Sequence, residues 1–92
     1  MADYLKAKGY QQITSLSSAT ALTVPAGTSV AVIQVQTQNV RWRDDGTDPT
    51  TTVGMLLLAG QTLEYFAADV AVVKFIEVTA SAALNVSYYG RT

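Results

Sequence analysis

Short apolar runs separated by turn residues recur along the whole of this 92-residue chain. The runs are rich in Val, Ile, Thr and aromatic residues, while Gly, Pro, Asp, Asn and Ser gather between them. Spacings of about ten residues between such runs are typical of β-sandwiches and barrels. No segment shows an apolar period of about 3.6 residues, which an amphipathic helix requires. The pattern therefore predicts an all-β fold, either a small antiparallel β-sandwich or a jelly-roll-like barrel.

The runs predict about eight short strands, at residues 10–16, 19–24, 29–37, 40–43, 50–58, 61–66, 71–79 and 83–89. The first strand is expected at a sheet edge, and the last strand should turn Leu84, Val86 and Tyr88 inward because side chains alternate between the two faces. Gly54 indicates either a β-bulge or the close approach of another backbone. Residues 90–92 are expected to form a tail.

One domain, residues 10–92, is expected to follow an extended arm, residues 1–9. The arm is too short to hold a helix unaided. Tyr4 and Leu5 could anchor it on a neighbouring molecule, although a frayed terminus is the other interpretation.

The composition points to a domain that associates with other subunits. The chain has no cysteine and no histidine, so it lacks disulfides, thiolate metal ligands and the commonest general base. Charged residues make up 14% of the chain, against a usual share of about 25%. A small domain with so few charges has more apolar surface than its own core can use, which favours a homo-oligomer. A neutral β-domain rich in Ala, Val and Thr is the alternative.

The distribution of charge argues against two classes of partner. The net charge is −1 and no basic block is present, so nucleic acid is not an expected partner. No apolar run approaches the roughly 18 residues of a membrane span, so a membrane is not expected either. The first residues lack the apolar core and cleavage site of a signal peptide, and the chain is expected in a cytoplasm or in a particle assembled there.

Residues 41–46 combine a large aromatic side chain with charges of both signs. Trp42 is in phase with Val40 and is predicted to face the core, which places Arg41 and Arg43 on the opposite face. The sequence Asp44-Asp45-Gly46 then begins a turn. A patch with both signs could pair with a copy of itself across an interface. The other interpretation is an intramolecular Arg–Asp pair, which stabilises little if exposed.

Catalysis is not expected from these residues. Asp44, Asp45 and Asp48 could offer oxygens to a hard cation, but the spacing lacks the glycine and the distal glutamate of a known calcium loop, and an Asx-turn explains the cluster equally. Glu64 and Glu77 would have to meet across strands to act as a glycosidase pair. No histidine or lysine base accompanies the serines and threonines. The sequence therefore predicts a non-enzymatic protein without metal or cofactor.

Adjacent tyrosines near the end of the chain indicate a surface contact. Tyr88 and Tyr89 follow each other on one strand and must point to opposite faces, so one of them should lie at a surface. The residues expected at an interface are Tyr4, Leu5, Arg41, Arg43, Asp44, Asp45 and Tyr89.

Several segments resemble the small virion proteins encoded among the head and tail morphogenesis genes of tailed bacteriophages and prophages. The more specific features are the tryptophan between two arginines, the Asp-Asp-Gly turn and the glycine–methionine step at Gly54. The resemblance rests on residues 22–27, 40–46, 49–50, 53–55, 60 and 84–89.

The resemblance implies a non-enzymatic structural subunit of a virion assembled in a host bacterial cytoplasm. Within that class, the resemblance favours a capsid decoration or cement protein that bridges shell subunits. Its partners would be copies of itself, often as a trimer, and the major capsid protein or other virion proteins. A neck, tail or fibre-attachment component is the alternative within that class. From another class, a carbohydrate-binding module would use exposed tyrosines or Trp42 as stacking platforms. A small sandwich enzyme is the third alternative, and the missing histidine counts against it.

Overall fold

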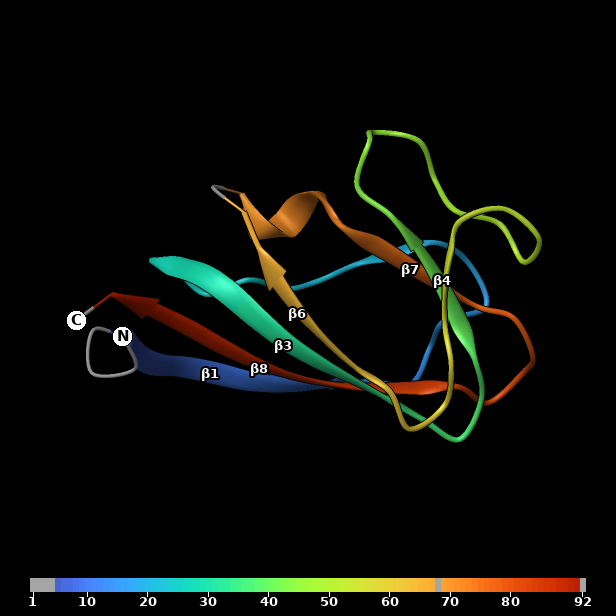
Figure 1. The fold of residues 1–92 in the computed structure, drawn as a ribbon, viewed down its shortest axis with the longest axis horizontal. Coiled ribbons are helices and arrows are strands. Elements are labelled where there is room, and N and C mark those ends of the chain that lie inside the picture. The colour runs from blue at the N-terminus through green and yellow to red at the C-terminus, as the bar shows by residue number, and fades with distance from the viewer. Residues whose placement is uncertain (1–4, 68, 92) are drawn as a thin grey trace.

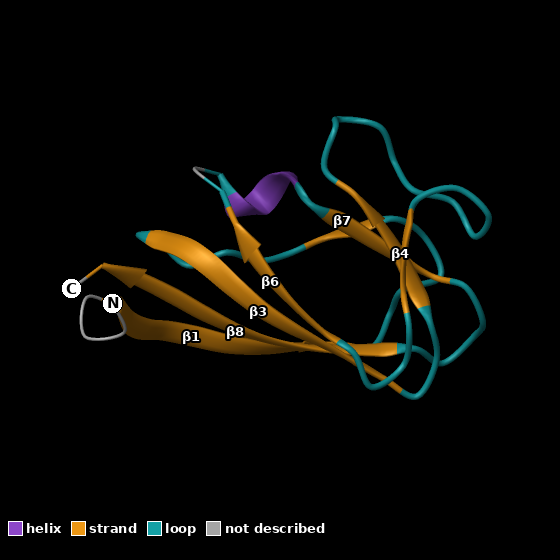
Figure 2. Cartoon of the chain, in the orientation of Figure 1, coloured by secondary structure: helices purple, strands orange, loops and turns teal. Residues whose placement is uncertain are grey.

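The computed structural model describes residues 5–67 and 69–91 of the chain. These residues form strands and one short 3-10 helix, as Figures 1 and 2 show. The elements are β1 (Leu5–Ile13), β2 (Thr20–Ala21), β3 (Thr28–Gln36), β4 (Val40–Arg43), β5 (Met55–Leu57), β6 (Thr62–Phe66), η2 (Val70–Val72), β7 (Lys74–Glu77) and β8 (Ala83–Arg91). The prediction of an all-β fold is confirmed.

Two antiparallel sheets of four strands pack against each other. The long sheet has the strand order β1-β8-β3-β6, and the short sheet has the order β2-β7-β4-β5. In both sheets the first half of the chain pairs with the second half in nested fashion, β1 with β8, β2 with β7, β3 with β6 and β4 with β5. A long hairpin folded over into two sheets in this way is a jelly roll. The sandwich is thus closed by pairing between residues far apart in sequence.

The core lies between the two sheets and draws on both. The long sheet contributes alternate residues of β3 and β8, and Leu84, Val86 and Tyr88 are buried as the alternation predicted. The short sheet contributes Val40 and Phe75, which are both fully buried. Burying a side chain of this size contributes about 1.5–3 kcal/mol relative to leaving it exposed.

Both ends of the described chain belong to the long sheet. Residues 5–9, expected in an arm, form the first half of β1 and pair with β8, with a bulge between Ala7 and Gly9. Gly90 and Arg91 of the expected tail also belong to a strand, since Gly90 in β8 pairs with Lys6 on one side and Thr28 on the other. Residue 92 lies outside the described residues. The sequence did not reveal these pairings because neither segment carries a marked apolar alternation of its own. Residues 1–4 lie outside the described part of the chain.

Three of the predicted strands are much shorter than expected. The run at 19–24 is a strand only at Thr20–Ala21. The run at 71–79 begins as the helix η2, since the Asp69 carboxylate accepts the Ala71 amide at 3.1 Å and caps a helical turn in place of a strand. The run at 50–58 is a strand only at Met55–Leu57, because the residues before it fold back over β4.

The radius of gyration is 12.6 Å, close to the value of about 12 Å for a compact domain of this length. The long axis measures 38 Å. The starts of β1 and β3 and the end of β8 lie at one end of this axis, and the loop between β4 and β5 lies toward the other (Figure 1). Within the described ranges, no helix has the length and apolarity needed to cross a membrane.

Candidate functional site: two exposed apolar surfaces

The residues predicted at an interface fall in two separate places. Arg41, Arg43, Asp44 and Asp45 lie on β4 and the loop that follows it, in the short sheet. Leu5 and Tyr89 line one hollow on the outer face of the long sheet. Tyr4 lies outside the described residues.

Trp42 faces inward from β4, as predicted. It packs against the core cluster, and its ring meets that of Tyr65 edge to face, with centroids 6.0 Å apart and planes at 73°. Edge-to-face geometry is favourable because the positive edge of one ring meets the negative face of the other. Trp42 therefore helps to hold β4 of the short sheet against β6 of the long sheet.

Arg41 fastens the loop that follows β4. Its Nε donates to the Thr51 carbonyl at 3.2 Å, and its Nη1 donates to the Gly54 carbonyl at 2.9 Å. Gly54 has a φ of +143°, and a Cβ there would lie 3.1 Å from Arg41 Cβ and 3.2 Å from the Trp42 carbonyl oxygen. Of the two alternatives for Gly54, a β-bulge or the close approach of another backbone, the structure shows the close approach. Two of the Arg41 donors are used in hydrogen bonds within the chain.

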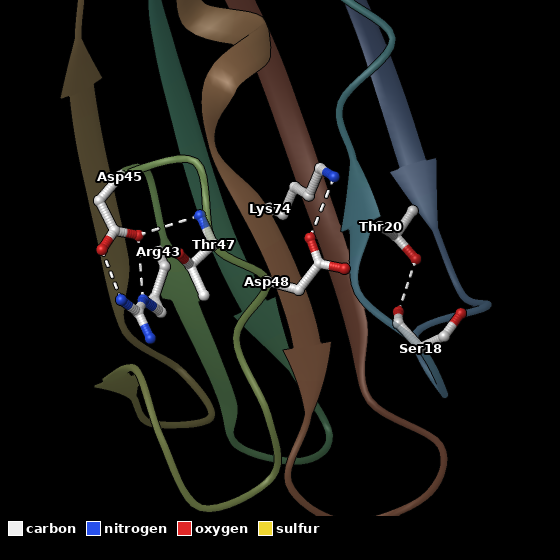
Figure 3. A network of polar contacts seen from close by, with 7 residues as sticks. All are labelled: Ser18, Thr20, Arg43, Asp45, Thr47, Asp48 and Lys74. Carbon is white, nitrogen blue, oxygen red and sulfur yellow. Dashed lines mark hydrogen bonds and ion pairs between the residues drawn. The ribbon is translucent and has the colours of Figure 1, made fainter.

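The charges of the loop are paired within the molecule. Arg43 and Asp45 form one ion pair through two hydrogen bonds: Arg43 Nε donates to Asp45 Oδ1 at 3.0 Å, and Arg43 Nη2 donates to Asp45 Oδ2 (Figure 3). The hydrogen bond from Arg43 lowers the pKa of Asp45 and raises that of Arg43. Of the two interpretations of the mixed-charge patch, the structure contains the intramolecular pair.

Each of the other two aspartates of the loop has a different partner. Asp48 Oδ1 accepts from Lys74 Nζ at 3.1 Å, which ties the loop to β7 (Figure 3). Asp44 Oδ2 accepts from the Tyr65 hydroxyl at 2.7 Å. Burial first, and then this hydrogen bond, raise the pKa of Tyr65 to about 12. Among the described residues, no three acidic, histidine or cysteine side chains converge in a way that could hold a metal ion.

A hollow of about 380 Å³ opens beside the Arg43–Asp45 pair, between Asp44, Val53 and Met55. Val53 and Met55 are 52% and 60% exposed. We call this region the hairpin surface and define it by the exposed apolar residues that line the hollow, Val53 and Met55. Leu56 pairs with Arg41 and points to the other face of β5. On this surface, exposed apolar side chains lie next to the Arg43–Asp45 ion pair, in which the two charges neutralise each other.

The second surface crosses all four strands of the long sheet. Ala7, Tyr89, Val30 and Phe66 lie directly opposite one another on β1, β8, β3 and β6. A hollow of about 300 Å³ lies along this row, at the small end of the range for binding pockets. We call this region the apolar end and define it by Leu5, Ala7, Val30, Val32, Phe66 and Tyr89. Val30 forms its floor and is only 7% exposed, whereas Leu5 and Phe66 at its sides are 36% and 65% exposed.

The rest of the same outer face is polar. Asn85 Nδ2 donates to Gln36 Oε1 at 2.6 Å, and Asn85 Oδ1 accepts from Tyr10 Oη at 2.6 Å and from Gln12 Nε2 at 3.1 Å. These side-chain hydrogen bonds centre on Asn85 and link β1, β8 and β3. The outer face of the long sheet is therefore divided into an apolar end and a hydrogen-bonded polar end.

The adjacent tyrosines divide between core and surface as predicted. Tyr88 is 1% exposed, its hydroxyl donates to Gln11 Oε1 at 2.6 Å, and burial raises its pKa to about 12. Tyr89 stands on the outer face beside Leu5. Phe66, which is 65% exposed, was missed by sequence reasoning. The alternation of Leu63 and Tyr65 with Glu64 carried the signal, because it places Phe66 on the same outward face as Glu64.

The two glutamates considered as a catalytic pair are not brought together. Glu64 lies on β6 in the long sheet and faces outward, whereas Glu77 lies on β7 in the short sheet.

Comparison of the chain with protein-family models, with curated proteins and with solved structures finds no match. The function must therefore be argued from the two surfaces themselves and from the resemblance of the sequence segments.

Proposed function

We propose that this chain is a non-enzymatic structural protein of a bacteriophage virion, of the capsid decoration or cement type. The observation that carries the proposal is the presence of two separate exposed apolar surfaces on one small domain. The apolar end lies on the long sheet and the hairpin surface lies on the short sheet. A subunit that bridges neighbours needs two such surfaces, whereas a module that binds one ligand needs a single site.

The mechanism would be the burial of apolar area at both surfaces. Each square ångström of apolar surface removed from water contributes about 25 cal/mol. Phe66 on one surface and Met55 on the other are both at least 60% exposed, so each offers area that a neighbour can cover. Separating shell subunits would then also expose these side chains, and the bridging protein would raise the free energy needed to open the shell.

The fold supports the proposal only by analogy. Jelly rolls occur in viral capsid proteins and also in lectins, and a fold hosts many functions. Trp42 packs inward, so it does not offer the platform on which sugar binding would have depended, although Tyr10 is 66% exposed. Virion assembly therefore stands first, with a neck, tail or fibre-attachment role as the alternative.

The test is the copy number of this chain in purified virions from a strain that encodes it, measured by quantitative mass spectrometry against the major shell protein. A ratio near one-to-one, or a fixed fraction of it, is expected for a decoration protein. A handful of copies per particle would instead assign the chain to the neck, tail or fibres. Absence from the particles would overturn the virion proposal.

A further inference from the structure

We propose that the apolar end binds the apolar end of a second copy of this chain about a two-fold axis, with Glu64 and Arg91 forming reciprocal ion pairs between the copies. This inference deepens the proposed function by naming the surface through which copies associate.

The shape of the apolar end favours contact with another molecule. The row of Ala7, Tyr89, Val30 and Phe66 is continuous across the sheet, because each residue is the direct cross-strand partner of the next. Phe66 at the β6 edge stands 65% exposed beside the hollow that it helps to line. A projecting aromatic side chain next to a hollow is the combination that interfaces use as an anchor.

Two charged residues flank the row on opposite sides. Glu64 precedes Phe66 by two residues on β6, so it shares the outward face and lies on one side of the row. Arg91 follows Tyr89 by two residues on β8, so it shares that face and lies on the other side of the row. Neither residue is in an ion pair within residues 5–67 and 69–91.

The positions of Glu64 and Arg91 suit a two-fold axis between two copies. In the strand order β1-β8-β3-β6, Val30 on β3 lies between the strands that carry Arg91 and Glu64. A two-fold axis that lies in the plane of the interface, passes near Val30 and runs perpendicular to the line from Glu64 to Arg91 sets Glu64 of one copy opposite Arg91 of its partner. The same axis sets Arg91 of the first copy opposite Glu64 of the partner subunit. A surface that carries an acid and a base at opposite corners of an apolar block is complementary to itself, as a two-fold interface requires.

The size of the surface sets the expected affinity. Stable interfaces bury about 800 Å² per partner and use 20–30 residues a side, roughly. The apolar end and its two charges comprise a smaller set, so we expect a weak dimer with a Kd on the order of micromolar rather than nanomolar. The exposed ion pairs should make the affinity fall as salt is raised.

The experiment is sedimentation equilibrium on the purified full chain and on three charge variants, Glu64→Arg, Arg91→Glu and the double variant. Each single reversal sets like charges opposite each other twice and should weaken dimerisation at least tenfold. The double variant restores opposite charges and should return the Kd to within about threefold of the starting value. Rescue by the double variant would not follow if either residue acted through folding alone.

Two matched substitutions test whether dimerisation depends on the apolar end or on exposed apolar area in general. Phe66→Ser should abolish the dimer, whereas Met55→Ser removes a similarly exposed side chain from the hairpin surface and should leave the dimer unchanged. Circular dichroism checks that each variant is folded. A monomer at all accessible concentrations, a trimer, or failure of the double variant to rescue would overturn the inference. The sedimentation experiment uses the purified protein alone, so its failure would overturn the dimer and leave the virion proposal standing. Absence of the chain from virions would overturn the virion proposal and leave the dimer standing.

Discussion

Substitution of Gly90 by alanine tests the packing of the chain ends most directly. Gly90 is buried in β8, between β1 and β3. A Cβ at this position would lie 1.9 Å from the Gly27 carbonyl oxygen and 2.9 Å from the Gly27 carbonyl carbon. Since carbon–oxygen contacts normally stay beyond about 3.3 Å, the turn at Gly27 would have to move by about 1 Å or more, or β8 would have to separate from β3.

The expected cost is at the upper end of the range for overpacking, about 3 kcal/mol, because the obstructing atoms belong to the backbone. A domain of this size loses about 1 kcal/mol of stability per molar urea. The urea midpoint, followed by the fluorescence of Trp42, should therefore fall by about 3 M. Since small domains have only about 5–15 kcal/mol in total, the variant should remain folded in the absence of urea but be easily unfolded.

Gly9→Ala is the matched control. Gly9 lies in β1 of the same sheet, and a Cβ there would meet only the Pro25 Cγ at 3.2 Å, a side-chain atom that can yield. Both substitutions lower the entropy of the unfolded chain by the same amount, so the difference between them isolates the backbone clash. Equal midpoints for the two variants would refute the close approach of Gly90 to Gly27.

Two further predictions concern aromatic residues of the core. Trp42→Ala should lower the free energy of unfolding by about 3 kcal/mol, the low end of the range for such truncations, because Trp42 is only partly buried. The thermal midpoint, measured by circular dichroism, should fall, and an unchanged midpoint would contradict the packing of Trp42 against Tyr65. The pKa values of about 12 for Tyr65 and Tyr88 exceed the ordinary value of 10.0, so the unfolded chain loses these protons first as the pH rises. The contribution of these two tyrosines to stability should be constant below about pH 10 and fall by at most about 3 kcal/mol per tyrosine between pH 10 and 12. Urea midpoints at pH 9, 10 and 11 measure this loss, Tyr88→Phe should remove about half of it, and a flat profile would show that neither phenol is buried.

The candidate surfaces were predictable only in part. Tyr89 and Leu5 were expected at an interface, and they line the same hollow. The pairing of Arg43 with Asp45 was one of two open interpretations, since sequence neighbours two residues apart can reach each other in a turn. The hydrogen bond from Tyr65 to Asp44 joins β6 to the loop after β4, and no local pattern specifies which strand will meet which loop.

The sequence by itself determined that this chain is all β, where most of its strands lie and which side chains of β8 face the core. These properties follow from the two-residue alternation of side chains and from turn chemistry, which are local. The tertiary structure decided the register, and with it the row of Ala7, Tyr89, Val30 and Phe66 and the need for glycine at position 90. Register depends on hydrogen bonds and packing between segments up to the whole length of the chain apart, so only the folded protein places these residues side by side.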